Sequence, residues 1–150
     1  MKNKTVAAWL ALVGGPLGLH RFYLKGGGDV LGWLLPIPTI LGVYGIVRVQ
    51  QFGLDDRWSW LLIPPMGFVV AGCALTAIIY GLMTPQRWNG KFNPSLHEED
   101  SAGETNWLTV GVLVLSLLLG TGVLMSSIAF SLQRYFEAQA VSVSSSEAPA

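Results

Sequence analysis

Residues 108–132 read LTVGVLVLSLLLGTGVLMSSIAFSL, a long run without a charged side chain. Residues 61–83, LLIPPMGFVVAGCALTAIIYGLM, form a second such run of similar length. The hydrocarbon core of a bilayer is about 30 Å thick, and a helix needs about 20 apolar residues to cross it. Each run is long enough for one transmembrane helix, and together they predict an integral membrane protein.

Two shorter runs without charge come earlier in the chain, at residues 5–19 and 30–47. The first run is short for a crossing. A helix that continues to Leu24, with the Arg21 side chain reaching back to the interface, would complete it. We therefore expect an all-α integral membrane protein with four transmembrane helices. Because the turn at residues 25–29 is short and contains three glycines, the first two helices should form an antiparallel hairpin.

Polar segments divide the rest of the chain. The expected organisation is a helical hairpin at 1–48, a polar connection at 49–60, a third transmembrane helix at 61–83, an extramembrane loop at 84–106, a fourth transmembrane helix at 107–132 and a disordered tail at 133–150. Pro36 and Pro38 should kink the second helix, since proline removes helical hydrogen bonds. Pro85 and Asn93-Pro94 favour turns in the long loop, where we expect little regular structure.

Composition excludes several classes of function. Charged residues make up only 12% of the chain, and nine Lys and Arg balance nine Asp and Glu. We expect no nucleic-acid partner, because such proteins normally carry a basic surface. The spans use so much of the chain that no separate soluble catalytic domain fits. Pumps and ion-coupled transporters normally carry ionisable residues within their spans, and none lies in the four runs. We expect neither a cofactor nor a metal.

An even number of spans places both termini on one side of the membrane. Short cytoplasmic loops carry an excess of Lys and Arg. The side with the termini would hold five basic residues and the other side four, namely Lys2, Lys4, Arg48, Arg57 and Arg134 against Arg21, Lys25, Arg87 and Lys91. Because Lys2 and Lys4 precede the first span, we predict that both termini are cytoplasmic. A small multi-pass protein that starts at its first span fits the bacterial inner membrane.

The densest local pattern is GPLGLHRFY at residues 15–23. Gly14 and Gly18 lie about one helical turn apart, a spacing that lets another helix approach closely. His20 and Arg21 carry donors that could hold a lipid phosphate or a loop carboxylate. The two aromatic residues that follow suit the headgroup region. Two interpretations stay open: an interfacial anchor that sets the depth of the helix, or a contact site for a lipid or a partner.

This pattern resembles the TM-two domain, a module of two transmembrane helices joined by a short linker. The resemblance covers residues 4–48, and the positions that carry it are Gly15, Gly18, His20, Arg21, Phe22 and Tyr23. It implies a membrane location and a helical hairpin. It implies no agreed biochemical activity, so it informs the fold more than the function.

The chain also departs from the family pattern. Members usually have Gly directly after the F-Y-x element, where this chain has Lys25. They tend to close the second helix with Trp and, one helical turn later, Asp, where this chain has Tyr44 and Arg48. If that Asp pairs with the His-Arg element in relatives, another carboxylate must serve here, and the candidates are Asp29, Asp55 and Asp56.

The other candidate residues predict structural roles rather than a catalytic or metal-binding site. Residues 97–100, HEED, are most simply a solvated acidic loop, because three adjacent carboxylates point in different directions and do not converge on a metal. Residues 55–57, DDR, should pair internally or with Arg48 at the interface. Cys73 has no partner cysteine and should be a small apolar core residue. The glycines expected at close helix contacts are Gly14, Gly18, Gly72 and Gly120.

The function predicted from these features is that of a non-enzymatic multi-pass membrane protein, a structural or interaction module. Its partners would be membrane lipids and a membrane protein or a second copy. The alternative is an oligomeric channel or permease for a small neutral solute, with broken-helix sites at the proline pairs 36–38 and 64–65. A third hypothesis is an interfacial enzyme that uses His20 with Asp55 or Asp56.

Overall fold

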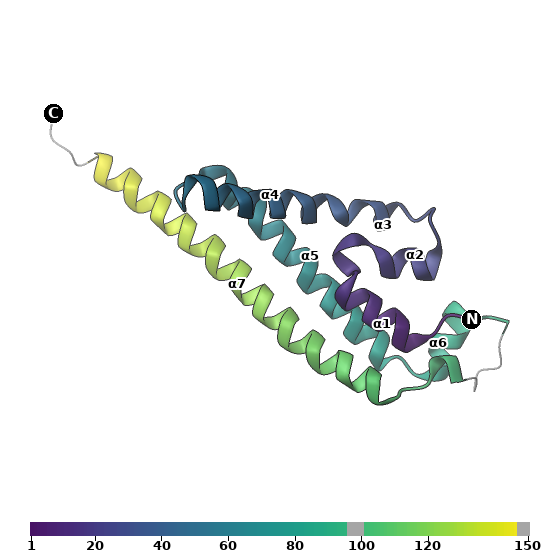
Figure 1. The fold of residues 1–150 in the computed structure, drawn as a ribbon. Helices are drawn as coiled ribbons and strands as arrows, with labels where there is room; N and C mark the ends of the chain where they lie inside the picture. The colour runs from purple at the N-terminus through teal and green to yellow at the C-terminus, as the bar shows by residue number, and fades with distance from the viewer. Residues whose placement is uncertain (96–100, 147–150) are drawn as a thin grey trace.

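The computed structural model describes residues 1–95 and 101–146, which fold into helices joined by short turns (Figure 1). The described residues contain no strand, which confirms the expected all-α class. The elements in chain order are α1 (Lys4–Val13), the 3-10 helix η1 (Gly15–Leu17), α2 (Leu19–Lys25), α3 (Val30–Leu34), α4 (Pro36–Phe52), α5 (Arg57–Leu82), α6 (Pro85–Phe92), the 3-10 helix η2 (Ser101–Gly103) and α7 (Trp107–Ser146).

Three helical segments of the described chain are long and apolar enough to cross a membrane. They are α3 with α4 over Val30–Phe52, α5 over Arg57–Leu82, and the segment Ser101–Val141 that contains most of α7. These segments coincide with the second, third and fourth runs that lack charge. Each helix extends past its run, because Gln and Arg at the ends of the runs favour helix and need not lie in hydrocarbon.

The first expected span is not one helix, and this is the main departure from the expected fold. α1 has only ten residues and ends at Gly14. Pro16 has no backbone N–H to donate, and Gly18 adopts the left-handed conformation with φ at 77°. The chain therefore turns through η1, where the sequence predicts a continuous helix.

α2 runs back alongside α1, so that both ends of this segment lie together. The Asn3 backbone N–H donates to the Tyr23 hydroxyl at 3.0 Å, and Lys2 Nζ donates to the Leu24 carbonyl. Figure 1 shows α1 leading away from the N-terminus and α2 returning toward that end. At about 1.5 Å per residue, the ten residues of α1 extend about 15 Å, half the thickness of a hydrocarbon core. We call residues 4–25 the N-terminal hairpin.

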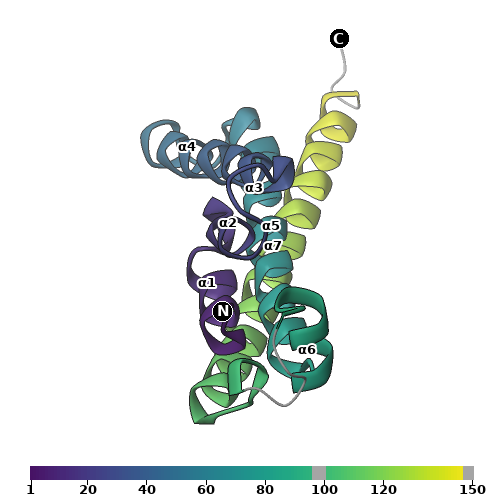
Figure 2. The same ribbon diagram turned by 90° about the vertical axis from the view of Figure 1, so that its right-hand side faces the viewer.

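Because of the N-terminal hairpin, the N-terminus lies beside the polar segment between α5 and α7. The Trp88 indole on α6 donates to the Lys2 carbonyl at 2.8 Å, and Lys4 Nζ donates to Thr105 Oγ1, just before α7, at 2.7 Å. We call the end of the molecule where these contacts lie the N-terminal end. The α4–α5 turn and the last part of α7 lie at the opposite end, which we call the far end (Figures 1 and 2). The first residues and the end of α7 thus lie at opposite ends, unlike the four-span prediction, because three long helices connect them where four were expected.

The long polar segment after α5 contains a helix, contrary to the expectation of little regular structure. The Thr84 hydroxyl accepts a hydrogen bond from the Arg87 N–H, and Pro85 occupies the first position of α6. Both features favour a helix start. Trp88 is completely buried and packs with Phe92 and Tyr80 of α5, with ring centroids 4.5 and 5.7 Å from its own. Burial of this aromatic face holds α6 against the bundle.

α7 continues beyond its expected end at residue 132, to Ser146. Up to that residue, the structure has a helix where the sequence predicts a disordered tail. Hydrogen bonds one turn apart support the extension: Gln133 Nε2 donates to Glu137 Oε1 at 2.8 Å, and Gln139 Nε2 donates to the Tyr135 hydroxyl at 2.8 Å. These local contacts explain why the helix does not end with its apolar run.

The two proline pairs of the long apolar segments have different surroundings. Pro36 and Pro38 lie in the first turn of α4, where a missing N–H costs little. Leu35, between α3 and α4, itself has helical angles of −61° and −37°. Pro64 and Pro65 lie inside α5, which continues through them. The helix is therefore interrupted at Leu35, just before Pro36, whereas α5 shows no break at Pro64 and Pro65.

α5 is the central helix and contacts α1, α4 and α7. Small residues allow the close approach. A Cβ atom on Gly81 would lie 2.7 Å from Leu113 Cδ2, and a Cβ on Gly67 would lie 1.7 Å from Ser127 Oγ. The buried residues of α1 include Ala7, Ala8 and Ala11.

Candidate functional site

The tip of the N-terminal hairpin is pressed against two other helices. A Cβ atom on Gly15 would lie 2.5 Å from Cβ of Cys73 on α5. A Cβ on Gly18 would lie 2.1 Å from the carbonyl oxygen of Gly32 on α3. Both distances are well inside van der Waals contact. Glycine at these two positions permits the approach, and Gly18 also supplies the positive φ of the turn.

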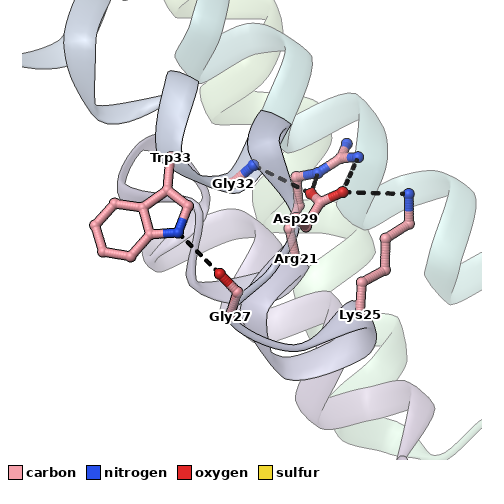
Figure 3. A network of polar contacts seen from close by, with 6 residues as sticks. All are labelled: Arg21, Lys25, Gly27, Asp29, Gly32 and Trp33. Atoms are coloured by element: carbon pink, nitrogen blue, oxygen red, sulfur yellow. Dashed lines mark hydrogen bonds and ion pairs between the residues drawn. The ribbon is translucent and has the colours of Figure 1, made fainter.

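Arg21 and Asp29 form an ion pair that closes the turn between α2 and α3 (Figure 3). Arg21 Nε donates to Asp29 Oδ2, and Nη2 donates to Oδ1 at 3.3 Å. Lys25 Nζ lies 3.7 Å from Oδ1, and the Gly32 N–H donates to Oδ2 at 3.1 Å, capping α3. The hydrogen bond from Arg21 is the main reason that the pKa of Asp29 lies below its ordinary value. Of the three aspartates considered as partners of the motif, the structure places Asp29 there.

The other two aspartates lie at the far end. Asp56 accepts from Arg48 Nε at 2.8 Å and from Nη2 at 2.9 Å, and its Oδ2 also accepts from the Ser59 hydroxyl at 2.6 Å. The Arg48 hydrogen bonds, followed by that of Ser59, lower the pKa of Asp56. Asp55 is exposed in the same turn. His20 belongs to the N-terminal hairpin, so the arrangement required by the enzyme hypothesis, His20 beside Asp55 or Asp56, is not formed within one chain.

The aromatic part of the motif is also engaged within the molecule. His20 is 3% exposed, and its ring centroid lies 6.3 Å from that of Tyr80. Phe22 packs edge-on against Trp33 of α3, with centroids 5.3 Å apart. The Tyr23 hydroxyl accepts the hydrogen bond from the start of α1. Each of the six motif positions therefore contacts another part of this chain.

The glycines expected at helix contacts have three different surroundings. A Cβ on Gly14 would meet the Leu19 side chain at 2.6 Å, a contact within the hairpin. A Cβ on Gly120 would lie 2.8 Å from Ala74 Cβ, between α7 and α5. A Cβ on Gly72 would meet no heavy atom within 4 Å, so Gly72 borders open space where a packing contact was expected.

The remaining predicted sites hold no cluster of reactive groups within the described ranges. Cys73 is buried at the contact with Gly15. The acidic loop predicted at residues 97–100 lies outside the described residues. Among the residues that the structure describes, no group of three His, Cys, Asp or Glu could hold a metal ion.

A buried lysine at the N-terminal end was missed from the sequence. Lys4 is 0% exposed, and its Nζ donates to the Met83 carbonyl at 3.0 Å and to Thr105 at 2.7 Å. Met83 follows the last turn of α5, where carbonyls lack helical partners and a cation is favoured. Next to it, the hydroxyls of Thr5 and Thr109 lie 2.7 Å apart. The sequence marks Lys4 only as a basic residue before an apolar run, which does not distinguish burial from an interfacial position.

The Asp29 ion pair predicts a specific dependence of stability on pH. Because the folded-state pKa of Asp29 is lowered, its contribution is present above the unfolded value of about 3.9 and is lost as the pH falls through the folded pKa. Asp29→Asn keeps a side-chain acceptor for the α3 cap but removes the charge. The melting temperature should therefore be lower for the variant than for the wild type at pH 5 to 7, and the difference should shrink below about pH 3.9.

The matched control for this experiment is Asp55→Asn, which removes an exposed carboxylate at the far end. Its melting temperature should follow that of the wild type across the range. A gap between Asp29→Asn and the wild type that stayed constant down to pH 2 would show that the charge of Asp29 does not contribute.

Comparison of the chain with protein-family models, with curated proteins and with solved structures found no match.

Proposed function

We propose that this chain is a non-enzymatic multi-pass protein of the bacterial inner membrane, similar to TM-two domain proteins, and that it acts as a structural or interaction module. The observation that carries this proposal is the internal engagement of the motif at residues 15–23. Its glycines, its ion pair and its aromatic rings hold the N-terminal hairpin against α3 and α5. The motif therefore has a structural role, and the outer faces of the long helices are left for lipids and partners.

The distribution of basic residues supports one orientation. The proposed topology has three crossings and a hairpin that returns to its starting side. Six of the nine Lys and Arg then lie toward the N-terminal end, namely Lys2, Lys4, Arg21, Lys25, Arg87 and Lys91. The other three, Arg48, Arg57 and Arg134, lie toward the far end. Cytoplasmic loops are enriched in such residues. In this proposal the N-terminus is cytoplasmic and the C-terminus lies outside, which replaces the five-to-four distribution of a four-span topology.

A groove between α5 and α7 offers a surface for a partner helix. It encloses about 320 Å³ and is bordered by Gly72 and Leu75 on α5 and by Leu117 and Gly120 on α7. Small residues let a further helix approach. Ser116 also lines it, and its hydroxyl is buried without a hydrogen-bond partner among the described residues. A polar group of this kind can bind across a helix interface in the membrane.

The alternative function, an oligomeric permease for a neutral solute, would use unwound backbone at membrane depth. The break at Gly14–Gly18 is of this kind. However, Gly15 and Gly18 are packed against Cys73 and Gly32, which favours a structural use of the break. We therefore rank the permease second.

In-cell photo-crosslinking tests the interaction module. A photoreactive residue at Leu117, which is 61% exposed and borders the groove, should capture a discrete membrane protein or a second copy, identified by mass spectrometry. A photoreactive residue at Met125, which is 58% exposed on α7, is the matched control and should capture lipid alone. Gly72→Leu should abolish capture by filling the groove. Lipid alone from both positions, or flux of a neutral solute such as glycerol through purified protein in liposomes, would contradict the proposal.

A further inference from the structure

A second cavity lies at the far end, between the start of α5 and the last part of α7. It encloses about 210 Å³, and its lining includes Arg57 and Trp60 from α5 and Arg134 and Glu137 from α7. One water molecule occupies about 30 Å³ in the liquid, so the cavity has room for a larger group. It shares no lining residue with the groove between α5 and α7 described above.

Two residues of this lining, Trp60 and Arg134, each carry a buried nitrogen donor that has no acceptor among the described residues. The donors are Nε1 of Trp60 and Nε of Arg134. Buried N–H groups in folded proteins are nearly always hydrogen-bonded, so two orphan donors in residues that line one cavity indicate a missing acceptor. Because both groups donate and neither accepts, the group they fit is rich in oxygen lone pairs.

The Arg134 side chain is held in place by contacts that leave its Nε without an acceptor. It is 6% exposed, its Nη1 donates to Glu137 Oε2 at 2.7 Å, and its guanidinium lies 5.5 Å from the centroid of the Phe130 ring. The other Glu137 oxygen accepts from Gln133 at 2.8 Å. The carboxylate is therefore already engaged through both oxygens, and Arg134 Nε needs an acceptor from elsewhere.

The position of the cavity suits an anion at the membrane surface. Trp60 lies in the first turn of α5, where the helix dipole favours negative charge, and Arg57 adds a second guanidinium. Tryptophan is also enriched at the level of lipid headgroups. Asp55 lies on the same lining, so the site carries a carboxylate that an ammonium group could face.

We propose that this cavity binds the phosphate of a phospholipid headgroup, with Trp60 Nε1 and Arg134 Nε donating to its oxygens. Guanidinium and indole donors suit a phosphate, and charge-assisted bonds of this kind are among the stronger ones. The Asp55 carboxylate favours a headgroup that also carries an ammonium, such as phosphatidylethanolamine. This proposal rests on the proposed function only in that the site lies in a membrane. It does not depend on the groove between α5 and α7.

The test uses the full chain in a neutral detergent, with native mass spectrometry to count bound ligand. Short-chain phosphatidylethanolamine is the first probe, and inorganic phosphate is a second arm that distinguishes a lipid from a free anion. Trp60→Phe removes the Nε1 donor and keeps an aromatic ring. Trp58→Phe is the matched control, because Trp58 lies in the same helical turn, is 64% exposed and does not line the cavity.

We expect the wild type and Trp58→Phe to bind the lipid equally and Trp60→Phe to bind it about tenfold more weakly. Binding of inorganic phosphate alone, with the same dependence on Trp60, would retain the phosphate site and assign it a free anion. Equal binding by all three proteins, or no binding of either probe by the wild type, would overturn the proposal. Melting temperatures of the two variants, measured in parallel, show that they are folded. Since Leu117 crosslinking reports on a different surface, failure of this site would not be confused with failure of the interaction module.

Discussion

A cysteine placed just ahead of Met1 and a cysteine at Gly27 should react with a membrane-impermeant maleimide from the same side of the membrane, and a cysteine at Leu54 only from the other side. The reason is the N-terminal hairpin, which returns the chain to the end from which it started. Four complete spans would instead separate the N-terminus from Gly27. The expected difference is close to all or none, because the charged reagent does not cross a bilayer.

The measurement uses right-side-out and inverted membrane vesicles of the full chain, with Cys73 replaced by Ala so that only the introduced thiol reacts. Gly27 is suited to substitution because a Cβ there would meet no heavy atom within 4 Å, and Leu54 is 58% exposed. A cysteine at Gly90 on α6, whose Cβ is equally unobstructed, is the control and should follow Gly27. Labelling of the N-terminal cysteine from the side opposite to Gly27 would show that the first segment crosses completely.

Gly18→Ala should destabilise the protein by about 3 kcal/mol. Two costs add at this position. The left-handed backbone, with φ at 77°, disfavours any residue with a Cβ. The new Cβ would also lie 2.1 Å from the Gly32 carbonyl oxygen, and backbone atoms of α3 cannot move aside without displacing the helix. The free energy of unfolding can be measured by titration of mixed micelles with SDS, followed by circular dichroism.

Two neighbouring glycines separate these costs. Gly26 also has a positive φ, 84°, but its ψ of 177° lies in a region that is essentially confined to glycine, and a Cβ there would meet nothing within 4 Å. Gly26→Ala should therefore cost about 2 kcal/mol through the backbone alone. Gly27→Ala has neither problem and should change the stability by less than about 0.5 kcal/mol. If Gly18→Ala changed the stability as little as Gly27→Ala, the left-handed turn and the close contact between the hairpin tip and α3 would both be disproved.

The helix class and three long apolar helices could be predicted from sequence, because they depend on the absence of charge over a length that a bilayer requires. The path of the first segment could not. Its charge-free run at residues 5–19 fits either a short span or half of a hairpin, and both satisfy the same preference for an apolar environment. The spacing of Gly14 and Gly18 suggests a groove for another helix, yet Gly18 is where the chain reverses. The Gly-Gly-Pro sequence at 14–16 was the available signal for a break.

The pairing of charges, too, could be predicted only in part from the sequence. Sequence limited the partner of the His-Arg element to three aspartates and could not choose among them. Asp29 follows Arg21 at the same separation in sequence as Asp56 follows Arg48, and each pair forms where a turn brings its two helix ends together. The far-end cavity lay beyond sequence reasoning altogether, since Trp60 and Arg134 belong to different helices and meet only through the packing of α5 on α7.

The amino-acid sequence alone was enough to establish that the chain is helical and that its long apolar segments suit a bilayer. It also singled out residues 15–23 as the densest local pattern of glycine, charged and aromatic residues. These properties are local: each depends on the side chains of one segment and on the medium that they prefer. The reversal of the first segment, the separation of the first residues from the end of α7 and the choice of Asp29 for Arg21 required the folded chain. They depend on close contacts such as Gly15 on Cys73 and Gly18 on Gly32, between segments whose mutual approach no single stretch of sequence specifies.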